Sequence, residues 1–130
     1  MVVRRLRGQG GDATVEAVLA VPVLLLLITT VIQFGLYYNA EQTAQSAARE
    51  GVRAARVEGG TALDGQQRAA EFMATAAPTL IDDVNVVAIR GADTARVDVR
   101  GVVHSIVHGV TLTVHAAAES PVERFRADTG

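Results

Sequence analysis

Three histidines are the residues whose type and spacing come closest to a metal or catalytic site. His104 and His108 are four residues apart, and His115 follows seven residues later. Imidazole nitrogens are common zinc ligands, so three of them on one sheet could bind a metal. The residues between His104 and His108 do not form a His-Glu-x-x-His motif, and the segment is typical of a loop between strands. We therefore expect histidines that are solvated or hydrogen-bonded, and no metal site.

Other catalytic signatures are missing from the sequence. Asp82 and Asp83 are adjacent, which is more typical of the start of a loop than of a calcium site or an acid–base pair. The chain has no cysteine, which excludes disulfides, thiol catalysis and cysteine zinc sites. It also lacks a Gly-x-Ser-x-Gly motif and a glycine-rich phosphate loop. We predict that the protein is not an enzyme and uses no cofactor.

Glu16 is the acidic residue whose position calls for a chemical explanation. It directly precedes 24 residues without a charge, residues 17–40. An ionised carboxylate costs on the order of 2.5–3.5 kcal/mol at the centre of a membrane and less near the interface. The carboxylate of Glu16 therefore either reaches headgroup water or has a partner.

The uncharged run predicts a membrane-spanning helix. At ~1.5 Å per residue it would span roughly 36 Å, enough for a ~30 Å hydrocarbon core with some tilt. The residues that mark this span are Ala17, Pro22, Leu25, Ile32, Phe34, Tyr37 and Tyr38. The last three are aromatic and suit the membrane–water interface, while Arg4, Arg5 and Arg7 before the run favour a cytoplasmic N-terminus.

Other interpretations of the apolar run are weaker. A cleaved secretory signal, with a mature start near Glu41, would need a shorter apolar region and a small-x-small cleavage site. A twin-arginine signal would rest on Arg4-Arg5 alone. A chain of 130 residues cannot easily bury such a helix in its own core. The net charge of −2, from 12 basic and 14 acidic residues, does not indicate nucleic-acid binding.

The residues before Glu16 form a pattern of their own. A short basic leader is followed by Gly11, four further residues, Glu16 and the apolar helix. This order resembles the class III signal of type IV prepilins, which a membrane prepilin peptidase cuts after the glycine. The resemblance implies cleavage between Gly11 and Asp12. It also implies that the new amino group of Asp12 pairs with Glu16 of a neighbouring subunit.

Residues 7–56 resemble the TadE-like family of tight-adherence (Tad) pilus systems. The resemblance rests on Val-Glu-Ala at 15–17, Pro-Val-Leu at 22–24, Gln-Phe-Gly at 33–35 and Ala-Ala-Arg-Glu-Gly at 47–51. Family members commonly have Phe after the glutamate, where this chain has Ala17. The resemblance implies a minor pilin or pseudopilin, which would be a filament subunit, a tip protein or an assembly factor. The alternatives are a permanently anchored accessory or binding protein that is not cleaved and, less favoured, a secreted enzyme.

The resemblance also implies partners and a location. The partners would be the prepilin peptidase, other Tad pilins, the inner-membrane platform proteins with their cytoplasmic ATPase, and the lipid bilayer. The protein would cross the membrane once. Its N-terminus would be cytoplasmic, and its C-terminal domain would lie outside the cytoplasm or in an extracellular pilus.

The rest of the chain predicts a small α+β domain. Residues 41–57 continue the first helix, with small residues Ala47, Ala48 and Gly51 on the face that packs against other helices. Asp64, as the N-cap, and Gln67, at N3, resemble the capping box of a short second helix that Pro78 closes. Period-two alternation then predicts three antiparallel strands: 84–90, 95–103 and 112–116. It predicts that Val97 and Val99 face inward and Arg96, Asp98 and Arg100 outward, and that Leu112, Val114 and Ala116 share one face. We expect a leader at 1–11, a spanning and spine helix at 12–57, an extracytoplasmic domain at 58–118 and a polar tail at 119–130.

Overall fold

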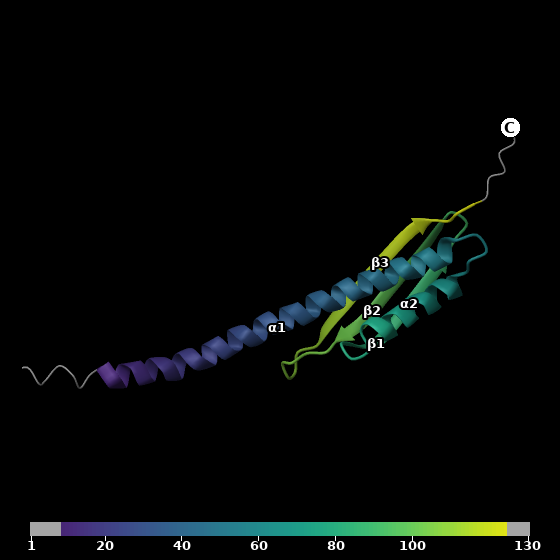
Figure 1. Cartoon of the computed structure of the whole chain (residues 1–130). Coiled ribbons are helices and arrows are strands. Elements are labelled where there is room, and N and C mark those ends of the chain that lie inside the picture. Colours follow the sequence, from purple (N-terminus) through teal and green to yellow (C-terminus); the bar gives the residue numbers. More distant parts are fainter. Residues whose placement is uncertain (1–8, 125–130) are drawn as a thin grey trace, which may run out of the picture. The chain divides into compact units, whose positions relative to one another are not determined.

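The computed structural model describes residues 9–124, with two helices and three strands (Figure 1). Helix α1 comprises Gln9–Arg56 and α2 Ala62–Ala76; the strands are β1 Ile81–Arg90, β2 Thr94–Val103 and β3 Leu112–Pro121. The chain divides into two compact units, residues 1–34 and 35–130, which we describe separately. The arginines of the predicted leader lie outside the described residues, as do the last six residues of the predicted tail.

The first unit is the apolar part of α1. The two threonines of residues 17–34, Thr29 and Thr30, donate their hydroxyl protons to the carbonyl oxygens of Leu25 and Leu26, each at 2.8 Å. These hydrogen bonds within the helix lower the free-energy cost of placing the two hydroxyl groups in lipid.

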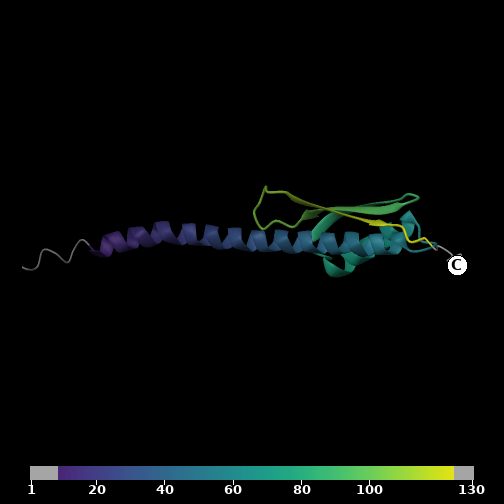
Figure 2. The same ribbon diagram turned by 90° about the horizontal axis from the view of Figure 1, so that it is seen from above.

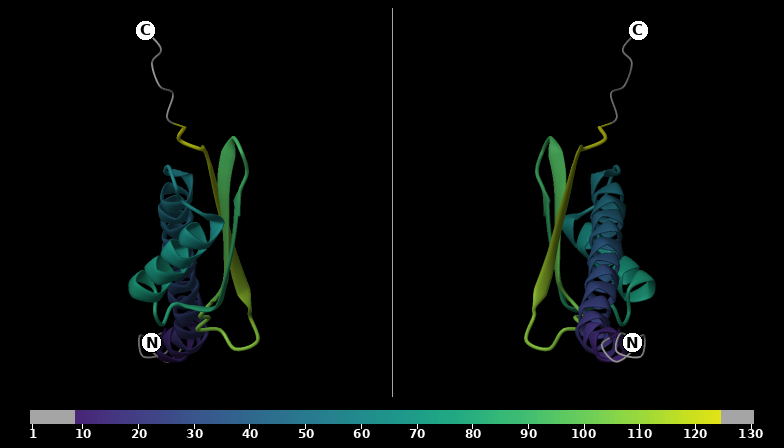
Figure 3. Two further views of the ribbon diagram at one scale, coloured as in Figure 1. Left: turned by 90° about the vertical axis from the view of Figure 1, so that its right-hand side faces the viewer. Right: turned by 90° about the vertical axis from the view of Figure 1, so that its left-hand side faces the viewer.

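The second unit is a three-stranded antiparallel sheet with helices on one face (Figure 3). The strand order is β1-β2-β3, and this arrangement confirms the predicted α+β class. Alternation along β2 is also confirmed, since Val97 and Val99 are buried while Arg96 and Arg100 are exposed. The core consists mainly of alanine and valine side chains, with Met73 the largest that is fully buried.

Two strands are longer than predicted. Strand β1 begins at Ile81, because Ile81 and Asp82 pair with Val103 and Val102 of β2. A register shift between Asp82 and Asn85 then interrupts the pairing, which resumes at Asn85. Asp83 adopts a φ of 51° there, a conformation that aspartate tolerates better than most residues. Strand β3 runs through Pro121, so it includes the first three residues of the segment that we expected to be a polar tail.

The capping box of α2 starts three residues earlier than predicted. Thr61 is the N-cap, and its hydroxyl oxygen accepts a hydrogen bond from the backbone N–H of Asp64 at 3.1 Å. The Asp64 carboxylate in turn accepts bonds from the Thr61 hydroxyl and backbone N–H, both at 2.8 Å. These bonds lower the pKa of Asp64. Asp64 therefore occupies the N3 position that we assigned to Gln67.

Candidate functional site

Glu16 heads an apolar face on the first unit. A shallow groove along α1 is lined by six residues: Glu16, Leu19, Ala20, Val23, Leu24 and Leu27. Their spacing of three and four residues places them on one side of the helix. The carboxylate thus lies at the N-terminal end of an otherwise aliphatic face, where a neighbouring helix can pack beside it.

The apolar segment has almost no cover from the chain itself. Residues 10–28 are all exposed, and Leu25 and Leu26 are 59% and 67% accessible. Ala17, Pro22, Ile32 and Phe34 are exposed as well. So many exposed aliphatic side chains in one segment require lipid or other protein around them. The helix is long and apolar enough to cross a membrane, consistent with a single-pass anchor.

The two tyrosines that follow belong to the second unit. Tyr37 is half-buried and packs against the hydrophobic core, whereas Tyr38 is 64% exposed. Tyr38 is therefore free to meet an interface, while Tyr37 helps to hold α1 against its own domain.

The predicted cleavage site lies in the first turns of α1. Gly10 and Gly11 have no neighbouring atoms around the position of a missing Cβ, and both are exposed. Thr14 donates its hydroxyl proton to the Gly10 carbonyl at 2.8 Å. Each glycine makes a helix less stable by about 1 kcal/mol relative to alanine. This end of the helix can therefore open at little cost into the extended form that a protease binds.

The small residues expected on the spine helix lie in the core of the second unit. Ala47 and Ala48 are fully buried, and Gly51 is buried against Gly65 of α2. The small face thus packs against the chain's own second helix and sheet, and in the second unit it is not open to a neighbouring subunit.

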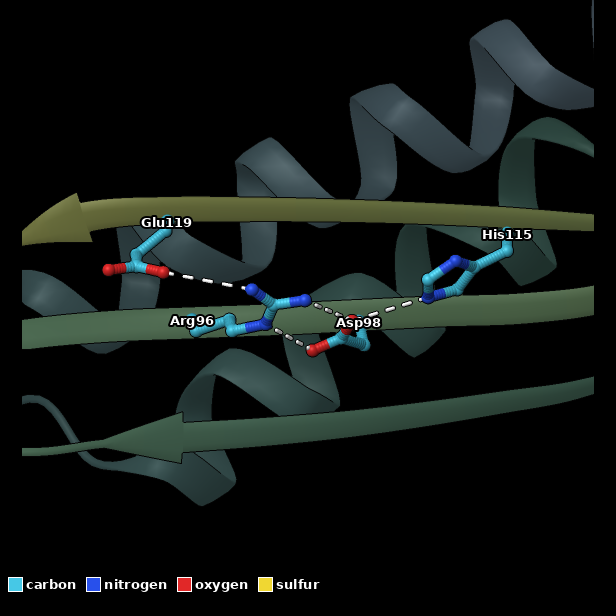
Figure 4. A network of polar contacts seen from close by, with 4 residues as sticks. All are labelled: Arg96, Asp98, His115 and Glu119. Atoms are coloured by element: carbon cyan, nitrogen blue, oxygen red, sulfur yellow. Dashed lines mark hydrogen bonds and ion pairs between the residues drawn. The ribbon is translucent and has the colours of Figure 1, made fainter.

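A polar network covers the outer face of the sheet (Figure 4). Arg96 binds Asp98 through two hydrogen bonds, Nε to Oδ2 at 2.8 Å and Nη2 to Oδ1 at 3.0 Å. His115 Nε2 lies 3.3 Å from Asp98 Oδ1, and Arg96 Nη1 lies 3.7 Å from Glu119. The hydrogen bonds from Arg96 lower the pKa of Asp98, although its partial burial acts in the opposite direction. The network links β2 to β3.

Sequence reasoning missed this network for a specific reason. Alternation indicated that Arg96 and Asp98 lie on the same face of the sheet, and this was the only sign of the network in the sequence. In the sheet, Glu119 lies opposite Arg96 and His115 lies opposite Arg100. These positions depend on the register of β3 against β2, which the sequence pattern does not fix.

The histidines occupy separate places. His104 Nδ1 lies 3.0 Å from Asp82 Oδ2 at the edge of the β2–β3 loop, whereas His115 is bound to Asp98 on the sheet. Within residues 9–124, no three histidine, aspartate or glutamate side chains are grouped so that they could hold a metal ion.

The comparisons with known proteins identify the N-terminal part of the chain. Residues 11–53 match the family model described as TadE-like protein. The resemblance drawn from the sequence motifs is therefore confirmed over this segment, which contains Gly11, Glu16 and the whole apolar run. No curated protein and no solved structure matches the chain.

Proposed function

We propose that this protein is a minor pilin or pseudopilin of a Tad-type pilus, with a structural rather than an enzymatic role. One observation carries the proposal. Within the TadE-like segment, an exposed aliphatic helix face begins at a single carboxylate, Glu16, five residues after Gly11. An anchor alone would need the aliphatic face but not the carboxylate at its head.

The proposed maturation explains the carboxylate. A prepilin peptidase cuts between Gly11 and Asp12 and leaves a new α-amino group on Asp12. In a bundle of such helices, this amine on one subunit pairs with Glu16 of another. A carboxylate at the membrane edge is costly while it is unpaired, so pairing favours entry into the assembly. The aliphatic groove then supplies the contact area for the neighbouring helix.

The proposed topology follows from the same segment. The N-terminus lies in the cytoplasm, and the α+β unit lies outside it. The partners are the peptidase, other Tad pilins, and the platform with its ATPase. The competing proposal is an accessory protein that stays anchored and uncut.

The experiment that tests this function is Glu16→Gln in a strain that assembles the pilus. The change keeps the size of the side chain and removes its charge. We expect the variant to reach the membrane at normal levels but to be depleted from sheared pili, or to reduce the number of pili. Glu58→Gln is the matched control, because Glu58 is exposed outside the apolar segment. Normal pili that contain the Glu16→Gln protein would contradict the proposal.

A further inference from the structure

The loop between β2 and β3, residues 104–111, exposes three aliphatic side chains. Ile106 is 54% exposed, Val107 40% and Val110 43%. The strands on either side bury their apolar residues, with Val103 and Val114 fully enclosed in the core. A loop that keeps three aliphatic residues in the open is unusual for a domain surrounded by water, and such patches mark contact sites.

The loop lies in a segment without formal charge. Residues 101–118 contain no Asp, Glu, Lys or Arg. One carboxylate lies beside the loop, that of Asp82 in β1, whose Oδ2 is 3.0 Å from His104 Nδ1. The loop tip can therefore leave water without stripping solvent from an ion, which is the main cost of entering a lipid interface.

The loop lies at the end of the second unit where the chain enters from the apolar segment. At the opposite end, the carbonyl oxygen of Arg56 in α1 accepts a hydrogen bond from the Glu123 N–H at 2.9 Å, and Arg56 Nη1 donates to the Ser120 hydroxyl at 3.3 Å. From this contact, β3 extends about 30 Å to its first residue, Leu112, and α1 extends about 30 Å to Gly35. Leu112 and Gly35 therefore lie at about the same distance from the contact. Figures 1 and 2 show that β3 and the later, blue-to-teal part of α1 run in the same direction, so the loop before β3 lies at the end where this unit begins.

We propose that the β2–β3 loop is a second membrane contact, with Ile106, Val107 and Val110 inserted into the interfacial layer of the bilayer. The proposal rests on the membrane anchoring proposed above. The chain enters this unit at Gly35, directly after the apolar segment, so the loop at that end is the part of the unit that the proposal assigns to the lipid surface. Asp82 and Asp83 at the start of β1 limit the depth, since their carboxylates stay in headgroup water. The exposed Tyr38 at the same end belongs to this contact.

Tryptophan fluorescence tests the proposal on the full chain, which contains no tryptophan of its own. Ile106→Trp is reconstituted into phosphatidylcholine vesicles with bromine atoms at a shallow or a deep acyl position. We expect blue-shifted emission, a strong loss of emission with shallow bromines and little quenching by aqueous iodide. Ile89→Trp is the matched control, because Ile89 is similarly exposed, at 59%, on β1. Its emission should be quenched by iodide and not by the brominated lipids.

A third variant, Leu25→Trp, separates failure of the loop contact from failure of the anchor. If deep bromines do not quench Leu25→Trp, the spanning segment itself is not in the membrane. If they do, and Ile106→Trp is quenched only by iodide, the loop contact alone is wrong. Emission from Ile106→Trp that is blue-shifted but insensitive to both quenchers would mean that protein covers the loop, which also overturns the proposal. Val110→Trp repeats the measurement at a second site, so that local rearrangement around one tryptophan does not decide the result.

Discussion

Gly51 of α1 and Gly65 of α2 lie against each other with no room for a side chain on either. A Cβ on Gly51 would lie 2.8 Å from the Gly65 carbonyl oxygen, and a Cβ on Gly65 would lie 2.9 Å from the Gly51 carbonyl oxygen. Both contacts are with backbone atoms, so no side-chain rotation relieves them. The pair sets the distance between the two helices and brings both close to Val97 of the sheet.

Gly65→Ala should therefore destabilise the domain. Overpacking a tight contact costs typically 1–3 kcal/mol, which exceeds the gain of about 1 kcal/mol from replacing a helical glycine. We expect a lower melting temperature for the full chain in detergent micelles, followed by circular dichroism. Gly35→Ala is the matched control, because Gly35 is also helical but has open space around it. It should be neutral or stabilising, and equal melting of the two variants would contradict the close approach.

Thr61→Ala should weaken the start of α2. The change removes the acceptor for the Asp64 N–H and the hydroxyl donor to the Asp64 carboxylate. Loss of such a cap costs about 1 kcal/mol, which lowers the melting temperature of a domain of this size by several degrees. Gln67→Ala, at the residue that the sequence alone suggested for the N3 position of the capping box, should have almost no effect. If Gln67→Ala lowered the melting temperature more than Thr61→Ala, the assignment of Thr61 as the N-cap would be wrong.

Asp98→Asn should make the stability of the domain less dependent on acid pH. The pKa of Asp98 is lower in the folded state, so the unfolded chain binds the proton first as the pH falls. The stability that Asp98 provides is therefore complete above about pH 4 and is lost as the pH drops through the folded-state pKa. We expect the melting temperatures of the two proteins to differ most near neutral pH and to converge in acid.

An Arg96→Gln background provides the control for this measurement. Hydrogen bonding to Arg96 is the main cause of the lowered pKa, so without it the effect of Asp98→Asn should vary much less with pH. A difference between the Asp98 proteins that is the same at every pH would show that the network does not stabilise the ionised form.

The elements of this fold follow largely from local patterns in the sequence. The uncharged run predicted the long apolar helix, and period-two alternation predicted which residues of β2 and β3 face the core. The position of the α2 cap was wrong because two adjacent segments, starting at Thr61 and at Asp64, both fit the capping pattern. Only the geometry shows that the Thr61 hydroxyl and the Asp64 carboxylate bind each other's backbone N–H groups.

Long-range relationships were not predictable in the same way. The small residues of α1 indicated that something packs closely against them, but not that Gly65 does so. The network around Asp98 depends on strand register, and the irregularity in β1 depends on a turn conformation at Asp83. The roles proposed for Gly11 and Glu16 rest on their spacing in the sequence. Both roles involve contacts with other proteins, and a single chain does not contain those contacts.

The most direct test of the account is the N-terminal residue of the mature protein, measured by mass spectrometry on protein from piliated cells. The account predicts a chain that begins at Asp12, and it predicts that Gly11→Ile blocks this trimming because a branched side chain restricts the extended backbone at the cut. An intact leader would contradict it in favour of a permanent anchor. A chain that begins near Glu41 would contradict it in favour of a secreted protein.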